Sequence, residues 1–156
     1  MPIPAYLNIP DIPGSVKVEG REDTMQIVGF DHGIHIPMDV KDGTASGTRV
    51  HGQFKILKNY DKASPELYKF LCQGKTIPQA DLSWYEIDDQ GNEKVYFTHT
   101  LQNAKVTNIK AWMPNVDDPQ TERYKHMEEV SFQYEKITWK FTDGNVEASD
   151  SWLEGR

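Results

Sequence analysis

Cysteine, basic charge and long apolar runs are the features that this sequence has least of. Cys72 is the only cysteine in 156 residues, which excludes an intramolecular disulfide and a zinc-thiolate cluster. The 17 Lys and Arg residues are outnumbered by 24 Asp and Glu, and the net charge of −7 argues against nucleic acid as a partner, because phosphate binding needs basic patches. No apolar stretch approaches the roughly 20 residues that cross a bilayer, so we expect no membrane insertion.

The N-terminal residues also lack the basic segment and the apolar run of a secretory signal peptide. We therefore expect that the Sec pathway does not export this chain. A length of 156 residues predicts a single domain over residues 1–156.

The composition favours β-structure. Val, Ile and Thr number 31, against 14 for Ala and Leu, a bias toward residues that suit a pleated, half-buried surface. In residues 49–56, Val50, Phe54 and Ile56 alternate with polar side chains, as in a strand with one buried face. One helix is predicted, with Ser64 as its N-cap, Pro65 at its first position and Gly74 at its end.

The pattern near the C-terminus changes phase. Residues 130–134 are apolar at even positions, whereas residues 137–141 are apolar at odd positions. A side-chain period of two cannot switch parity along a regular strand, so we predict a bulge or a corner at Glu135 and Lys136. Strands that turn corners are typical of barrels and orthogonal sandwiches. The Asp143-Gly144 pair that follows predicts a hairpin with a two-residue turn.

A strand region over residues 25–38 is interrupted by Gly29 and Gly33, which predict local bends. Its even positions from Val28 to Met38 are mostly apolar and are predicted to share one face. Residues 39–48 then carry almost no apolar bulk and include two glycines, so we predict a long, exposed hairpin loop.

The sequence gives little evidence for a catalytic or metal-binding site. A three-histidine metal site from His32, His35 and His51 is conceivable, but residues three apart on a strand point to opposite faces, which disfavours it. No nucleophile elbow is present, and Cys72 lacks an obvious catalytic partner. We predict no catalytic residue, no metal and no cofactor.

Several motifs resemble the haemolysin-coregulated protein (Hcp) family, the tube proteins of type VI secretion systems. They are IPAYL at 3–7, GTRVH at 47–51, SPELYK at 64–69, WY at 84–85, YEKITW at 134–139, DGN at 143–145 and SDSW at 149–152. The resemblance implies a mainly β fold: a β-barrel of two antiparallel sheets, flanked by one short α-helix and carrying a long protruding hairpin loop.

The same resemblance implies a structural protein rather than an enzyme. Family members form homo-hexameric rings that stack into a hollow tube inside a contractile sheath, with a spike trimer at the tip and effectors in the lumen. Such a chain is assembled in the bacterial cytoplasm and then secreted without a Sec signal peptide. The resemblance assigns ring-stacking or inter-subunit contacts to the loop residues Asp39, Lys41, Asp42, Gly43, Thr44, Ser46, Gly47 and Thr48, and candidate lumen or cargo contacts to Phe30, Asp31 and His32.

A hypothesis of a different class is a monomeric β-sandwich that binds or hydrolyses carbohydrate. Trp84, Trp112 or Trp139 would then provide aromatic platforms for sugar rings. Sixfold assembly and sugar-dependent quenching of tryptophan fluorescence discriminate between the two hypotheses.

Overall fold

The structure is a computed structural model that describes residues 3–152. Its elements are β1 (Ala5–Asn8), β2 (Met25–Asp31), β3 (Ile34–His35), β4 (Val50–His51), β5 (Phe54–Asn59), α1 (Ser64–Gln73), β6 (Ile77–Ile87), β7 (Glu93–Trp112), the 3-10 helix η1 (Pro119–Thr121), β8 (Met127–Gln133), β9 (Lys136–Phe141) and β10 (Val146–Ser151). Neither helix in residues 3–152 has the length and apolar character needed to cross a bilayer.

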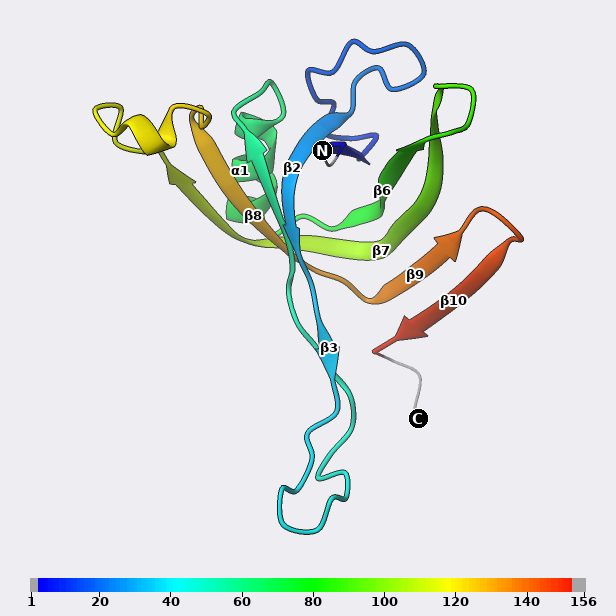
Figure 1. The fold of residues 1–156 in the computed structure, drawn as a ribbon. Helices are drawn as coiled ribbons and strands as arrows, with labels where there is room; N and C mark the ends of the chain where they lie inside the picture. Colours follow the sequence, from blue (N-terminus) through cyan, green and yellow to red (C-terminus); the bar gives the residue numbers. More distant parts are fainter. Residues whose placement is uncertain (1–2, 153–156) are drawn as a thin grey trace.

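Six antiparallel strands close into a barrel. The sheet runs in the order β10-β9-β7-β6-β1-β2-β5-β8, and an additional pairing of β8, its last strand, with β7 closes the barrel. β7 makes this closure because it is 20 residues long: its first part pairs with β6 and β9, and its last part pairs with β8. The mainly β barrel that the sequence predicts is confirmed, and the β9–β10 hairpin extends the sheet beyond the barrel (Figure 1).

The predicted phase change is a corner rather than a bulge. Gln133 pairs with Lys105, and Lys136 pairs with Gln102, so two residues separate the pairs on each strand and none is inserted. Both strands bend together at this point. Asn103 adopts a left-handed φ of 52°, and its side-chain amide donates to Glu135 over 3.0 Å. The corner moves the buried face from even to odd positions without changing the register against β7.

A bulge does occur in β2. The register against β5 shifts between Ile27 and Gly29, which leaves Val28 46% exposed. Ile27 is buried on one side of the bulge and Phe30 packs against the core on the other. The prediction of a bend at Gly29 is confirmed, but the prediction that even positions from Val28 onward share one face is wrong, because the extra residue reverses the alternation.

The helix α1 packs beside β7 and buries Leu67 and Phe70. It ends where the sequence predicts, at Gly74 with a left-handed φ of 63°. Its start differs, because Ala63 is the N-cap and Ser64 is already helical. The Ser64 hydroxyl is instead used in tertiary contacts: it donates to Glu128 over 2.8 Å and accepts from the backbone N–H of Asp61 over 3.1 Å.

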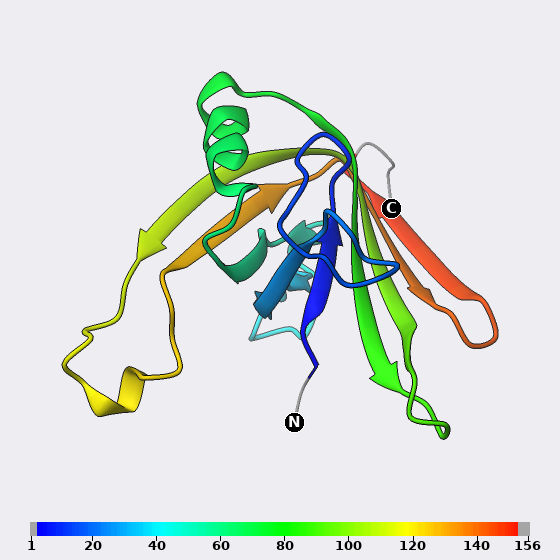
Figure 2. The same ribbon diagram turned by 90° about the horizontal axis from the view of Figure 1, so that it is seen from above.

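Two hairpins project from the barrel. The arm, defined here as residues 36–49, extends from β3 and β4 away from the barrel, at the end opposite to the β6–β7 turn (Figure 1). The β9–β10 hairpin lies along one side, as the view from above also shows (Figure 2). Its loop has four residues rather than the predicted two, because Phe141 pairs with Val146 and both Gly144 and Asn145 adopt left-handed φ angles.

Candidate functional site

The arm is a narrow hairpin held by backbone hydrogen bonds. Met38 and Ala45 form a bridge across it, and the N–H of Asp39 donates to the carbonyl of Thr44 over 2.7 Å. The tip is closed by the Asp39 carboxylate, which accepts from the N–H of Lys41 over 2.8 Å. Among the predicted loop contacts, all are exposed except the half-buried Gly47: Asp39, Lys41, Asp42, Gly43, Thr44, Ser46 and Thr48.

The arm carries three large exposed apolar residues, which we call the apolar row. Ile36 and Met38 are each 53% exposed, and Val40 is 97% exposed. Apolar side chains in a projecting hairpin of one molecule have nothing to bury them there, and such rows mark contacts with another molecule. The predicted loop contacts did not include these residues, because Ile36 and Met38 precede the loop of residues 39–48 and Val40 is not one of its polar residues.

A chain of hydrogen bonds, which we call the arm-base network, joins the base of the arm to the β9–β10 hairpin. His32 Nε2 lies 2.9 Å from the Tyr134 hydroxyl, and His51 Nδ1 lies 2.5 Å from the same oxygen. His51 Nε2 is 2.6 Å from Asp150 Oδ2, which also accepts from Arg49 Nε over 2.6 Å. Five side chains from four segments of the sequence are therefore linked in one chain.

The chemistry of each group sets the direction of these bonds. The Asp150 carboxylate only accepts, so His51 Nε2 donates to it. Nδ1 of a neutral His51 then accepts from the Tyr134 hydroxyl, whose oxygen accepts from His32 Nε2–H. All three polar hydrogens thus have acceptors, and the chain runs in one direction from His32 to Asp150.

The surroundings hold these groups in that state. The hydrogen bond from Arg49 holds the pKa of Asp150 below its usual value. Burial, with the charge of His51 as the second cause, lowers the pKa of His32. Burial, reinforced by the negative charge of Asp150, raises the pKa of Tyr134. The network therefore ends on an ionised Asp150 carboxylate, and its Tyr134 hydroxyl stays protonated.

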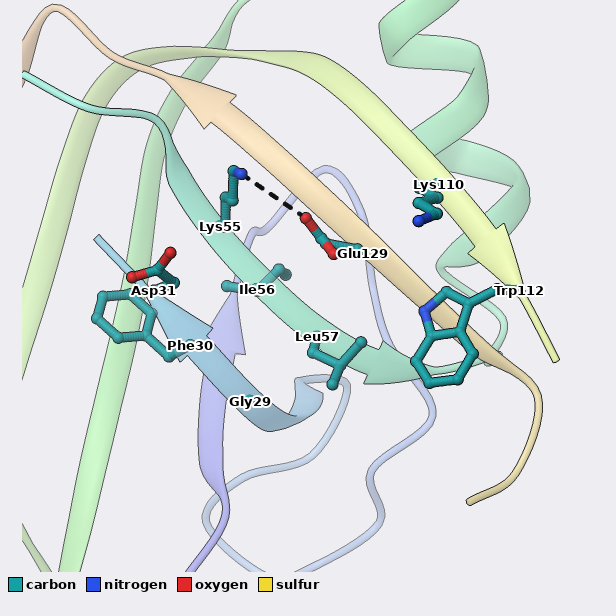
Figure 3. Close-up of a pocket in the computed structure, with 9 residues that line it drawn as sticks. All are labelled: Gly29, Phe30, Asp31, Lys55, Ile56, Leu57, Lys110, Trp112 and Glu129. Carbon is teal, nitrogen blue, oxygen red and sulfur yellow. Dashed lines mark ion pairs between the residues drawn. The ribbon is translucent and has the colours of Figure 1, made fainter. Parts of the chain in front are cut away.

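The three candidate lumen contacts point in different directions. Phe30 turns toward the core, with its ring centroid 4.9 Å from that of Phe54, and His32 belongs to the arm-base network. Asp31 is exposed and lines a groove of about 410 Å³ on the outer face of β2, β5, β8 and β7 (Figure 3). Phe30 also lines this groove, but His32 is not among its lining residues, so the three candidates do not share one surface.

This outer groove combines charge with an apolar floor. Lys55 and Glu129 face each other across neighbouring strands with 3.9 Å between Nζ and Oε1, and Lys110 stands nearby (Figure 3). Leu57 and Trp112 supply apolar surface. The groove is open because Gly29 has no side chain: a Cβ there would lie 2.9 Å from Leu57 Cβ.

The three histidines considered as metal ligands do not come together in the structure. His32 and His51 approach the same phenol, whereas His35 is exposed on β3. Within residues 3–152, no group of three His, Cys, Asp or Glu side chains is arranged to hold a metal ion. Tyr134, His51 and Asp150 have the order of a hydrolase triad, but Tyr134 is 3% and His51 5% exposed, so the hydroxyl is closed to a substrate.

Sequence reasoning missed the arm-base network. His32 and Tyr134 are 102 residues apart, and Arg49 and Asp150 are 101 apart, so no local spacing links them. A signal was present only in the motifs, since GTRVH at 47–51 contains Arg49 and His51, and SDSW at 149–152 contains Asp150.

A closed barrel with one helix, a projecting hairpin and a C-terminal hairpin tied to its base is an architecture with known counterparts. The family model described as "Type VI secretion system effector, Hcp" matches residues 6–141. A curated relative, the "Major exported protein" of Pseudomonas aeruginosa, is 37% identical over 142 residues, which are 91% of this chain and 83% of the relative.

Solved structures agree with this match. The Hcp1 protein of the E. coli EAEC 042 pathovar is 37% identical with a TM-score of 0.84, and the alignment covers 98% of this chain and 99% of that one. A crystal structure of another Hcp protein is 28% identical with a TM-score of 0.86, covering 97% of this chain and 99% of that one. The chain belongs to the Hcp family of the type VI secretion system.

Proposed function

We propose that this chain is the subunit of the secretion tube: it forms hexameric rings that stack into a hollow conduit and acts by assembly rather than by catalysis. The observation that carries the proposal is the apolar row of the arm. Ile36, Met38 and Val40 project beyond the barrel and gain burial only against a second molecule.

Two further features support ring formation. Among the strands of residues 3–152, β10 pairs with β9 alone, which makes it an edge strand that a neighbouring subunit can cover. Val146 and Phe141, at the end of that hairpin, are also exposed. A closed cyclic ring satisfies such an edge in every copy, because each subunit makes the same contact with the next.

The proposal extends to location and partners. The tube would assemble in the bacterial cytoplasm within a contractile sheath, carry a spike trimer at its tip and leave the cell through the type VI apparatus. The relative from Pseudomonas aeruginosa carries the name "Major exported protein", which is consistent with export of this chain. Effector proteins would travel in the lumen.

The test is the native mass of the full chain in solution, measured by light scattering. We expect a closed ring of about six copies, and a stable monomer at micromolar concentration would overturn the proposal. Val40→Asp should leave the ring intact and reduce its stacking, because it places a charge in the apolar row. Thr76→Asp is the control: it adds the same charge at an exposed position outside the arm and should stack like the unchanged protein.

Asp31 is the candidate cargo contact that the geometry favours, because it lines the outer groove and is the only exposed side chain among the three candidates, whereas Phe30 lines the same groove but is half-buried. Asp31→Arg reverses its charge and should lower retention of co-expressed effectors without changing the mass of the ring. Unchanged retention in an intact ring would contradict this assignment. Lys41→Glu, a charge reversal on the arm, serves as the control for general changes in surface charge.

A further inference from the structure

We propose that the arm-base network is a proton-counting latch: it keeps the arm docked on the β9–β10 hairpin while it holds no more than one added proton, and it releases the arm when both His32 and His51 are charged. The latch itself follows from the hydrogen bonds of this chain. Its measurement in assembled rings rests on the proposed function.

The first added proton is accommodated by reversing the chain of hydrogen bonds. A proton on His51 Nδ1 makes that nitrogen a donor to the Tyr134 oxygen, and the ion pair with Asp150 is kept. The Tyr134 hydroxyl must then turn to the other imidazole. His32 Nε2 can accept this hydrogen only if His32 changes from the Nε2–H to the Nδ1–H tautomer.

The network cannot accept a second added proton without losing a hydrogen bond. With both imidazoles charged, both donate to the Tyr134 oxygen, and the phenolic hydrogen loses its acceptor in a site where Tyr134 is only 3% exposed. A buried hydroxyl without a partner is costly, and two like charges now share one phenol. The direction of the His32 pKa shift, below its ordinary value through burial and the charge of His51, agrees with this resistance.

The other charged groups around the site come from each element that packs against it. Asp31 on β2 favours a charged His32, and His99 on β7 disfavours it. Arg49 and Asp150 compensate each other at the His51 end. The charges nearest His51 therefore balance, and those near His32 have opposite effects. What limits the number of added protons is the Tyr134 hydroxyl, which needs one of the two imidazoles as its acceptor.

The latch acts on the arm because of where its members lie. His51 is in β4, paired with Ile34 of β3 at the root of the arm, and the N–H of Gly52 donates to Gly33 over 2.8 Å beside it. Tyr134 and Asp150 belong to the corner after β8 and to β10. Protonation therefore alters the contact between two hairpins rather than the barrel.

The first experiment follows histidine ring nitrogens by NMR in the full chain labelled on histidine. We expect both imidazoles in the Nε2–H form at pH 8, a change of His32 to the Nδ1–H form as His51 is charged, and a separate, lower titration of His32. Independent titrations without any tautomer change would overturn the latch.

The second experiment measures amide exchange at Gly52 and β3, corrected for intrinsic rates, in rings at pH 7.5 and 4.5. Protection should fall by about tenfold or more on acidification. Tyr134→Phe keeps the aromatic side chain but removes the shared hydroxyl. In this variant, protection should differ by less than about twofold between pH 7.5 and pH 4.5. His35→Asn is the control: His35 lies on β3 but is exposed and outside the network, so this variant should behave like the unchanged protein.

Equal protection at both pH values, or the same loss in Tyr134→Phe as in the unchanged protein, would overturn the proposal. Because His99 is present in both proteins, its own titration cancels in this comparison. The native mass, measured at the same pH values, separates the two proposals: a monomer refutes the ring, whereas a ring whose arm ignores pH refutes only the latch.

Discussion

Lys58 of β5 and Glu128 of β8 form an ion pair, and both side chains are 0% exposed. The pair lies beside the first turn of α1, where Ser64 donates to Glu128. Lys58 Nζ also donates to Asp61 over 2.9 Å, and one carboxylate oxygen of Glu128 has no hydrogen-bond partner among residues 3–152. Such a pair contributes little over an apolar substitute, but losing one partner leaves the other charge buried.

Lys58→Met should therefore lower the free energy of unfolding by about 3–5 kcal/mol, because it leaves the Glu128 carboxylate buried without its cationic partner. Urea unfolding at a fixed protomer concentration measures this. Lys55→Met is the matched control: the same substitution on the same strand breaks the half-exposed pair with Glu129 and should cost about 0–1 kcal/mol. Equal losses in both variants would contradict the assignment.

The second prediction concerns the close approach of β2 and β5. A Cβ on Gly29 would lie 2.9 Å from Leu57 Cβ, so Gly29→Ala should destabilise the protein by about 1–3 kcal/mol through overpacking. Leu57→Ala in the same chain should recover part of the loss. Gly33→Ala is the control, since nothing lies within 4 Å of its added Cβ, and a comparable loss there would refute the steric explanation.

The third prediction is an acid transition at His99. Burial, with the nearby His32, lowers the pKa of His99 to about 4, and His99 Nδ1 accepts from Trp84 Nε1 over 2.9 Å. The folded protein therefore binds fewer protons than the unfolded chain below pH ~6.5, and stability falls as the pH drops from there toward 4. Trp84 fluorescence should change with a midpoint near pH 4.

His99→Asn provides the comparison for this transition, because its side-chain oxygen accepts in place of Nδ1 and does not titrate. It should remove the fluorescence step. Trp84→Phe should remove the same step by removing the reporter. A step that persists in His99→Asn would assign the transition to another group.

The fourth prediction concerns the order of the arm. Residues 39–48 are almost entirely polar and exposed, and only a few backbone hydrogen bonds close the hairpin, so its amides should exchange rapidly in isolated rings. Stacking should slow that exchange by about tenfold or more by burying the apolar row. Equal protection in rings and in stacked tubes would contradict a stacking role.

The sequence predicted the corner at Glu135, the end of α1 at Gly74 and the polar arm, because each depends on local periodicity or on the backbone freedom of one residue. It did not predict the reversed alternation in β2, since a bulge at Ile27 and Gly29 is decided by the register against β5. The Ser64 prediction was wrong for a similar reason: its hydroxyl bonds Glu128 of a distant strand instead of capping α1.

The class of this protein was determined by its sequence alone, because strand patterns and motifs of the Hcp family are spread over the whole chain. Only the tertiary structure decided which side chains meet. The network of His32, Tyr134, His51 and Asp150 joins segments about a hundred residues apart, and burial turns ordinary polar residues into a coupled set. Periodicity encodes which face of a strand is apolar, whereas proximity arises only when the barrel closes.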